Sequence, residues 1–282
     1  FKRHSQAVIA SEFRYMHPHL DEKTLVVIIS QSGETADTLA AMRIAEHHGA
    51  KTVGIVNVEN STIAQECKNV IFTRAGKEVA VATTKAYSAQ LAAVYLLTLY
   101  LAGAANTLSQ KAVAEYVDEL KAVPDKIEQI LSEPEKIKPF ADIADKSGYI
   151  CFIGRGFDYC AAMEASLKLK EISYIPCESY AAGELKHGTI SLIDKDSLTV
   201  ALCCFKELQS KTLANINEVK ARNGKTVIVS DDGGDITIPK TKDIFVPMLE
   251  VIPMQLLAYY TAEKRGCPID KPRNLAKSVT VE

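Results

Sequence analysis

The segment from Leu25 to Thr35, L-V-V-I-I-S-Q-S-G-E-T, constrains the fold more than any other stretch of the chain. An apolar, β-branched run leads directly into a polar loop, and an amphipathic segment that ends at Gly49 follows it. This order predicts a buried parallel strand, a tight turn and a helix.

The predicted turn is a candidate anion-binding site. It offers the hydroxyls of Ser30, Ser32 and Thr35, the amide of Gln31 and the free backbone N–H groups of a helix start. A helix N-terminus favours an anion through its N–H groups and its dipole. The loop contains no lysine or arginine, so hydrogen bonds rather than an ion pair would hold a phosphate. An ordinary strand-to-helix turn with a Ser or Thr cap explains the same residues equally well.

Composition limits the class of protein. The chain has 282 residues, of which 47% are hydrophobic and 24% charged, with a net charge of −2. The length suits about two domains, and the charge indicates neither a nucleic-acid footprint nor attraction to an anionic membrane. We find no apolar run that approaches the length of a membrane span and no secretory h-region.

The seven cysteines contain no C-x-x-C pair, and most lie in apolar stretches. We therefore expect them to be reduced and mostly buried, in a cytoplasmic protein. No His, Cys or carboxylate group has the spacing of metal ligands, so we expect no metal site.

Strands alternate with helix-length segments in both halves, which predicts an α/β protein with parallel sheets between helices. The region 104–138 is charged and helical, and we expect Pro124 and Pro134 to break it. The predicted strands are 25–30, 52–56, 69–74, 149–154, 198–204, 226–230 and 244–247, with 7–15 extended; the other predicted helices are 83–101, 156–173, 208–223 and 251–266.

The two halves repeat one scheme. Leu198 corresponds to Leu25, Val227 to Val53, Ile244 to Val70, and the region 178–180 falls near 11–15. The strand and helix of 149–173 have no counterpart in the first half. We therefore expect the first domain to lack its opening strand and helix; a genuinely smaller first sheet is the alternative.

The second half carries two groups suited to acid–base chemistry. Lys168 and Glu171 are three residues apart and would share a helix face. Such a pair is ordinarily a solvated surface pair, but in a cleft Glu171 would move a proton between adjacent sugar carbons. The stretch C-E-S-Y-A-A-G-E-L-K-H-G-T reads as a loop in which Gly183 and Gly188 flank His187. A lone histidine is more often a surface group than a catalyst, although long loops frequently carry sites.

The final segment, K-P-R-N-L-A-K-S-V-T-V-E, is neither highly charged nor rich in Gly and Ser. An extended tail of this composition could place Lys277 in a cleft, where partial burial would suit an amine nucleophile. A frayed terminus is the simpler interpretation.

Four motifs, S-Q-S-G-E-T-A-D-T, L-K-L-K-E-I-S-Y, A-A-G-E-L-K-H-G and P-R-N-L-A-K-S-V-T-V-E, resemble the isomerase half of the glutamine:fructose-6-phosphate amidotransferases. The resemblance covers 9–282. It implies two sugar-isomerase (SIS) domains of three α-β-α layers. We expect a first domain with its helical connection at 1–137, a second at 138–267 and a C-terminal tail at 268–282 that closes the active site.

The resemblance also implies roles for individual residues. Catalytic roles fall on Glu171 as the proton shuttle with Lys168 beside it, on His187 for ring opening, and on Lys277 for a Schiff base. His187 would act in the site of a neighbouring subunit, which implies a homodimer. Substrate-binding positions are Ser30, Gln31, Ser32, Thr35, Val81 and Ala276. A G-T-S phosphate loop of the family has no match here, in agreement with the missing opening unit.

The implied reaction is the isomerising transfer of ammonia to fructose 6-phosphate, giving glucosamine 6-phosphate. A glutaminase domain, which this chain does not contain, would supply the ammonia, and no metal or organic cofactor is expected. Two other functions stay open. One is a phosphosugar isomerase or deaminase that does not use glutamine, and the other is a non-catalytic module that senses a sugar phosphate.

Overall fold

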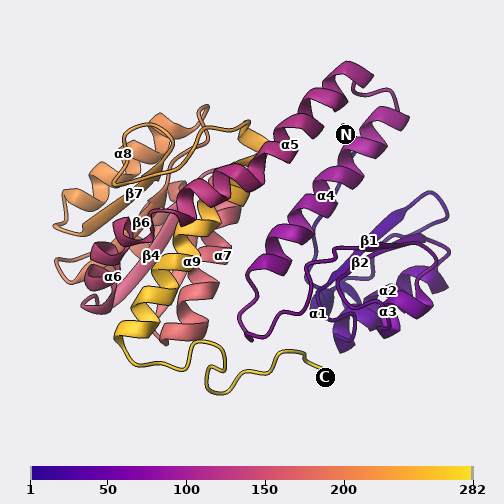
Figure 1. The fold of residues 1–282 in the computed structure, drawn as a ribbon, viewed down its shortest axis with the longest axis horizontal. Coiled ribbons are helices and arrows are strands. Elements are labelled where there is room, and N and C mark those ends of the chain that lie inside the picture. The colour runs from indigo at the N-terminus through magenta and orange to yellow at the C-terminus, as the bar shows by residue number, and fades with distance from the viewer. Residues whose placement is uncertain (1, 281–282) are drawn as a thin grey trace. The chain divides into compact units, whose positions relative to one another are not determined.

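The computed structural model describes residues 2–280; Phe1 and the last two residues of the predicted tail, Val281 and Glu282, lie outside the described residues. The chain forms two compact units. Unit 1 runs up to Val117 and includes the tail from Ala276, and unit 2 is Asp118–Leu275. In Figure 1, unit 1 comprises the part of the chain from indigo to the start of helix α5, together with the yellow end of the tail.

Unit 1 is built on a parallel three-stranded sheet of order β1-β2-β3. Residues Leu25 to Ser30 pair in register with Lys51 to Val56, which confirms the predicted parallel strand. Helices α2 and α3 connect consecutive strands, and the labels of Figure 1 place them together beside β1 and β2. The elements are α1 (Ala10–Phe13), β1 (Leu25–Ser30), α2 (Ala36–His47), β2 (Lys51–Val56), α3 (Thr62–Glu66), β3 (Val70–Phe72) and α4 (Lys85–Ala104).

Two expectations for unit 1 are wrong in part. The region 7–15 is not extended throughout, because Ala10–Phe13 forms one helical turn in which the N–H of Phe13 donates to the carbonyl of Ile9. The strand β1 is only partly buried: Val27 and Ile29 are exposed while Ile28 is buried. As an edge strand with β2 as its partner in the described sheet, β1 has one covered face and alternates like a half-buried strand.

Helix α5 (Gln110–Leu131) carries the chain from unit 1 into unit 2 and continues through Pro124, contrary to the predicted break. A proline removes one helical N–H but does not by itself end a helix that other contacts hold. Here Glu119 pairs with Lys126 across the proline at 2.5 Å and also accepts the hydroxyl of Thr241 at 2.7 Å. The 3₁₀ turn η1 (Pro134–Lys136) and α6 (Lys138–Asp145) follow.

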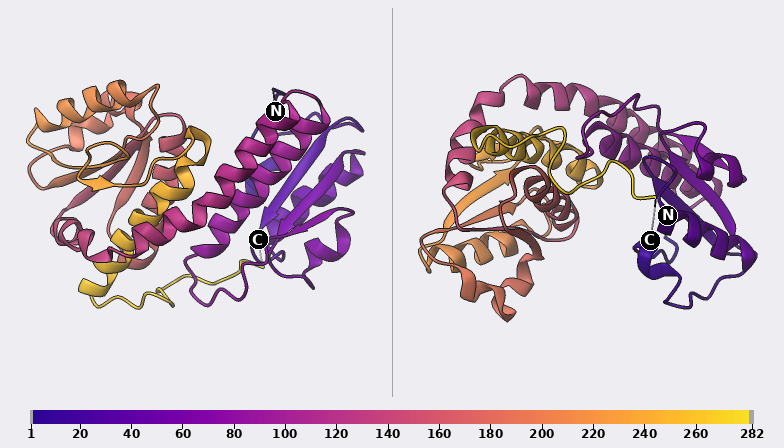
Figure 2. Two further views of the ribbon diagram at one scale, coloured as in Figure 1. Left: turned by 45° about the horizontal axis from the view of Figure 1, so that its top comes forward. Right: turned by 90° about the horizontal axis from the view of Figure 1, so that it is seen from below.

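Unit 2 contains a parallel five-stranded sheet of order β5-β4-β6-β7-β8. The chain moves from β4 outward to β5 through α7, then returns to the other side of β4 with β6. Right-handed crossovers in opposite directions place α7 and α8 on opposite faces of the sheet, as Figures 1 and 2 show. The elements are β4 (Tyr149–Gly154), α7 (Phe157–Ser173), β5 (Cys177–Ala181), η2 (Ala182–His187), η3 (Thr189–Leu192), β6 (Ser197–Leu202), α8 (Gln209–Lys220), β7 (Lys225–Ser230), β8 (Ile236–Thr237), η4 (Asp243–Phe245) and α9 (Val246–Lys264).

The core of unit 2 lies on both faces of this sheet. All six residues of β6 are buried, as expected for a strand with a neighbour on each side and helices on both faces. Helix α9 packs against α7, and most of its length is buried from Val246 onward. The described sheet of unit 1 has no counterpart of β4 and β5, in line with the expectation that the first domain lacks its opening strand and helix.

Two sequence predictions for unit 2 are wrong. Residues 177–181 are not a loop but β5, which pairs in parallel with β4 from Ile150 to Gly154. Residues 244–247 are not a strand, because Pro247 lies in the first turn of α9, where a proline favours helix initiation. The last strand of the sheet is Ile236–Thr237, so this strand rather than 244–247 is the counterpart of β3, and by register Ile236 corresponds to Ile71.

The expectation that no segment is long and apolar enough for a membrane span is also wrong. By length and composition alone, the helices at Lys85–Ala104 and Asp243–Lys264 both qualify. The second is a core helix, 72% buried inside the fold, whereas 28% of the first is buried. Core helices of this kind meet the same criteria as membrane helices.

Candidate active site

The loop after β1 closes on itself through its own hydroxyls. The hydroxyl of Ser30 accepts the N–H of Gly33 at 3.0 Å and lies 3.3 Å from the hydroxyl of Thr35. The hydroxyl of Ser32 accepts the N–H of Glu34 at 3.2 Å. The sequence-predicted Ser30, Gln31, Ser32 and Thr35 are thus gathered at the N-terminus of α2, and we call residues 30–35 the cradle loop.

Glu34 fixes the cradle loop to the next turn of unit 1. Its carboxylate accepts both the backbone N–H and the hydroxyl of Thr62, each at 2.7 Å, at the start of α3. Sequence reasoning missed this residue. An acidic residue facing a downstream helix N-terminus is a recognisable signal, but only once the pairing of β1 with β2 brings the two turns together.

Position 33 accommodates only glycine without strain. Its φ is +69°, and a Cβ would meet the Ser61 hydroxyl oxygen at 2.1 Å. We expect Gly33→Ala to lower the free energy of unfolding by about 2–3 kcal/mol, because the left-handed backbone and the overlap with Ser61 add. Urea unfolding measures this loss.

Gly49→Ala is the matched control, since Gly49 has φ +83° and no heavy atom within 4 Å of its would-be Cβ. It should cost about 1 kcal/mol from the backbone conformation alone. Equal losses in the two variants would contradict the argument for close contact with Ser61.

The C-terminal tail lies on the cradle loop. The hydroxyl of Ser278 donates to that of Ser32 at 3.1 Å, across 246 residues of sequence. The carbonyl of Val279 accepts the N–H of Ala36, the first residue of α2, at 3.2 Å. The tail is therefore seated on unit 1 rather than frayed, and Ser278 is a second contact that sequence reasoning missed.

These contacts bring Lys277 to the edge of the cradle loop. Its amine lies 3.2 Å from the hydroxyl of Thr83, 3.5 Å from the carbonyl of Val81 and 3.9 Å from the carboxylate of Glu78. The side chain is 27% exposed. Lys277 and Val81, both predicted from sequence, thus meet, and the structure adds Thr83 and Glu78.

A cavity of about 440 Å³ joins these parts of unit 1, lined by Gln31, Ser32, Asn57, Val58, Gly76, Lys77, Glu78 and Lys277. Cavities of a few hundred Å³ are typical of small-molecule sites. The hydroxyl and amide groups of the cradle loop suit an anion, and the amine of Lys277 suits a carbonyl. Ala276, also predicted to line the sugar, is exposed and precedes this lysine in the tail.

In unit 2, one face of α7 holds Lys168 between two carboxylates. The amine of Lys168 lies 2.7 Å from Glu171 and 3.4 Å from Glu164, and the lysine is buried. Burial raises the pKa of Glu164, and the charge of Lys168 partly opposes that rise. The pair predicted from sequence is therefore not a solvated surface pair. Glu164 was missed, although its spacing of four residues from Lys168 places it on the same helix face.

The geometry leaves Glu171 able to accept a proton. Its Oε2 atom is buried and has no hydrogen-bond partner within residues 2–280, so its contact with Lys168 is a charge pair without good hydrogen-bond geometry. A carboxylate with a buried oxygen and unused lone pairs is a candidate base.

His187 ends the 3₁₀ segment η2 and is exposed on unit 2. The guanidinium of Arg155 supports this segment: it lies 2.9 Å from the Cβ position of Gly183 and bonds Asn215 at 3.0 Å. A larger residue at 183 would displace this arginine. The glycine that sequence analysis associated with function thus has a packing role.

The counterpart of the cradle loop in unit 2 is filled by the protein itself. After β6, the N–H groups of Cys204 and Phe205 donate to the carboxylate of Asp158, at 3.2 Å and at 2.9 Å. Asp158 is fully buried, and the neighbouring Phe157 contacts Phe205 edge to face. A side-chain carboxylate therefore occupies the place that an external anion would take.

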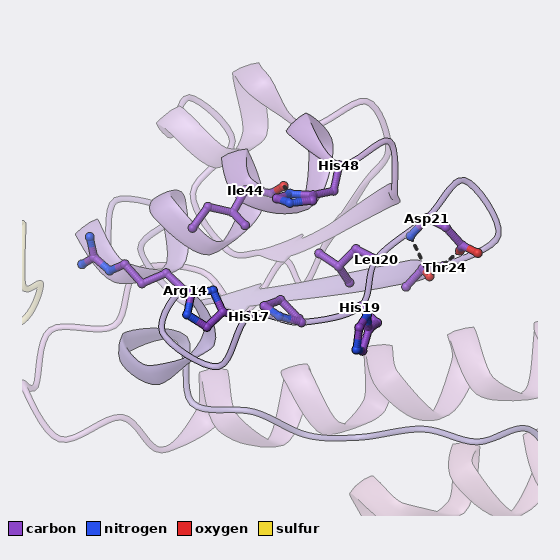
Figure 3. Close-up of a pocket in the computed structure, with 9 residues that line it drawn as sticks. Arg14, His17, His19, Leu20, Asp21, Thr24, Ile44 and His48 are labelled. Carbon is purple, nitrogen blue, oxygen red and sulfur yellow. Dashed lines mark hydrogen bonds between the residues drawn. The ribbon is translucent and has the colours of Figure 1, made fainter.

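Unit 1 has a second cavity, of about 580 Å³, near the C-terminal end of α2 (Figure 3). It shares no lining residue with the cradle loop; its lining is Arg14, His17, Pro18, His19, Leu20, Asp21, Thr24, Ile44 and His48. Throughout residues 2–280 we find no group of three or more His, Cys, Asp or Glu side chains placed to hold a metal ion.

Two parallel sheets between helices, with a hydroxyl-rich loop after a strand of the first, define a SIS-domain protein. The SIS domain profile matches residues 2–100 and 143–262, and the chain belongs to this family. More particularly, the chain is similar to the glutamine–fructose-6-phosphate aminotransferases. It is 49% identical over 283 residues to the enzyme of Clostridium tetani and equally to that of Caldanaerobacter subterraneus.

These alignments cover 97% of this chain and 46% of each relative, so the chain spans about half the length of the curated relatives it matches. Among solved structures, the C-terminal domain of glucosamine-fructose-6-phosphate aminotransferase from Francisella tularensis superposes with a TM-score of 0.89 at 38% identity, covering 94% of this chain and 77% of that one. A glucosamine-6-phosphate deaminase from Thermotoga maritima gives 0.77 at 25% identity, covering 96% and 80%.

Proposed function

We propose that this chain is the isomerase part of an enzyme that makes glucosamine 6-phosphate from fructose 6-phosphate and glutamine-derived ammonia. The similarity to the C-terminal part of the aminotransferases supports the reaction class. The observation that carries the proposal is the cavity of unit 1, which has hydroxyl donors of the cradle loop on one side and the amine of Lys277 on another.

In the proposed reaction, the cradle loop binds the sugar phosphate through Ser30, Gln31, Ser32 and Thr35. His187 opens the sugar ring, and the amine of Lys277 then attacks the C2 ketone. Water leaves as the imine forms. Val81 and Ala276 line the sugar. No metal or organic cofactor is required, because the imine serves as the electron sink.

Glu171 is the proposed base, and Lys168 holds its charge. Ammonia delivered by a glutaminase domain would add to the C2 imine and displace the amine of Lys277, which leaves an imine of ammonia at C2 and a free lysine. The carboxylate of Glu171 then takes a proton from C1 and returns it to C2, which converts the ketose imine into the aldose amino sugar. The buried, partly unsatisfied Oε2 of Glu171 supports this role.

We further propose a homodimer in which His187 serves the neighbouring subunit, since this histidine is exposed on unit 2. The proposed domains are 1–137 and 138–267, with the tail 268–282 closing the site. A cytoplasmic setting is supported by free cysteines, five of which are buried: Cys67, Cys151, Cys177, Cys203 and Cys204.

Glu171→Gln tests the role of the base. We expect fructose 6-phosphate to bind with unchanged affinity, because Glu171 is in unit 2 and the cradle loop is in unit 1. Isomerisation should fall by about 10²- to 10⁴-fold, the range for loss of a general base. Calorimetric binding and a coupled isomerase assay measure the two quantities.

Turnover that survives in Glu171→Gln would place the base elsewhere. A phosphosugar deaminase is the second candidate function, because the Thermotoga maritima structure is named as one. Ammonia release from glucosamine 6-phosphate, without any isomerising synthesis when ammonia is added to fructose 6-phosphate, would favour that alternative.

A further inference from the structure

Glu78 is a buried carboxylate with donors on one side and the tail lysine on the other. Its side chain is only 3% exposed. One oxygen accepts the N–H of Thr84 at 2.7 Å and its hydroxyl at 3.2 Å, and the other accepts the N–H of Ala86 at 3.3 Å. These donors belong to the first turn of α4, so Glu78 caps that helix and is itself held rigidly.

The second oxygen of Glu78 also faces Lys277. The carboxylate and the amine are 3.9 Å apart, and the contacts of the amine with Thr83 and Val81 come from the same loop. The loop between β3 and α4 therefore presents three oxygen atoms to one amine. A helix cap alone needs no contact with the C-terminal tail.

We infer that Glu78 is the positioning residue for Lys277: its fixed negative charge holds the amine at the cavity, while Thr83 and Val81 direct it. The importance of this positioning for catalysis rests on the proposed function, because an imine-forming lysine must meet the substrate carbonyl in one orientation. The helix α4 supplies the rigidity, because the carboxylate that caps it cannot move without breaking the cap.

The charge environment of Lys277 makes the inference testable. Besides Glu78, the charged side chain that lines the cavity with this lysine is Lys77. Glu34 of the cradle loop is bound to Thr62. Removing the Glu78 charge therefore removes an opposite charge 3.9 Å from the amine, and Lys277 should lose its proton at a lower pH.

The experiment is competitive reductive methylation with formaldehyde across a range of pH, read at each lysine by mass spectrometry. In Glu78→Gln the pH of half-maximal labelling at Lys277 should fall by about one unit. In Glu78→Asp, where the charge is withdrawn by one methylene, it should fall by less. Thr84→Val removes a hydroxyl from the cap but keeps the charge, so it should leave the labelling pH unchanged.

Unchanged labelling of Lys277 in both Glu78 variants would overturn the inference. A shift of the same size in Thr84→Val would also overturn it, because the effect would then come from the cap. The Asp variant keeps the test decisive if the Gln variant does not fold.

Borohydride trapping with fructose 6-phosphate separates this inference from the proposed function. If the wild-type chain forms no adduct on Lys277 while Glu78→Gln shifts the labelling pH of that lysine, the imine proposal fails and the role of Glu78 stands. If the adduct forms and the labelling does not shift, only the role of Glu78 fails.

Discussion

Replacing Lys277 by arginine is expected to abolish borohydride-trapped imine with fructose 6-phosphate and to lower isomerisation by about 10⁴-fold or more, as for loss of a covalent nucleophile. A guanidinium keeps the positive charge beside Glu78, 3.9 Å from the present amine. It does not deprotonate in proteins, so it cannot attack a ketone. Sugar phosphate binding should persist, because the cradle loop is unchanged. Mass spectrometry of the reduced protein, with calorimetry for binding, makes the measurement.

Lys85→Arg is the control for Lys277→Arg. Lys85 is the first residue of α4, and its amine donates to the carbonyl of Lys77 at 2.8 Å; Lys85 itself does not line the cavity. This variant should trap the sugar normally. A reduced adduct that persists on another lysine in Lys277→Arg would remove the tail from the mechanism.

Replacing Glu250 by glutamine is expected to stabilise the protein at neutral pH. Glu250 on α9 is fully buried, no N–H or O–H group of the described chain donates to its oxygens, and the carboxyl group of Asp158 and the thiol of Cys204 lie beside it. Burial, and then the charge of Asp158, raises the pKa of Glu250 well above its usual range. Burial likewise raises the pKa of Asp158 to about 6. The two carboxyl groups therefore retain protons in the folded state that the unfolded chain has already released.

The sign of the pH dependence follows from these shifts. Where the folded state binds more protons than the unfolded state, stability falls as pH rises. The free energy of unfolding should therefore decrease as the pH rises from 4.5 through the raised pKa values of Asp158 and Glu250. Glu250→Gln carries no charge and should gain about 2 kcal/mol at pH 7.5, with little gain at pH 4.5. Urea unfolding at the two pH values measures the difference.

Asp158→Asn is the contrasting variant. Its amide keeps one acceptor oxygen but places an NH2 group where the second carboxylate oxygen now accepts from the N–H groups of Cys204 and Phe205. A lost acceptor for buried donors should destabilise the protein at both pH values. If Glu250→Gln changed stability equally at pH 4.5 and pH 7.5, the buried charge would not be the cause.

The local sequence pattern was sufficient to predict those elements whose bounds are set by residues nearby in the chain. The strands at Leu25–Ser30 and Tyr149–Gly154 have the expected bounds because an apolar run ends at a polar or glycine-containing turn. The prediction for β5 was wrong for the opposite reason. Its residues carry little β propensity of their own, and they become a strand by pairing with the buried β4.

Two predictions at segments that contain a proline were wrong. Pro124 lies inside α5 and Pro247 at the start of α9, where the sequence predicted a break and a strand. In each case tertiary contacts determine the outcome. The Glu119–Lys126 pair spans Pro124 within α5, and packing against α7 stabilises helix α9, which begins near Pro247. Propensity is a weak preference that tertiary contacts override.

The sequence by itself determined the fold class, the position of the cradle loop and the helix face shared by Lys168 and Glu171, because each depends on residues a few positions apart. Only the tertiary structure decided that Lys277 meets Thr83 and Glu78, that Ser278 rests on Ser32, and that Asp158 closes the equivalent loop of unit 2. Those contacts join segments far apart in the chain. Their partners are set by how strands and helices pack, which no local spacing encodes.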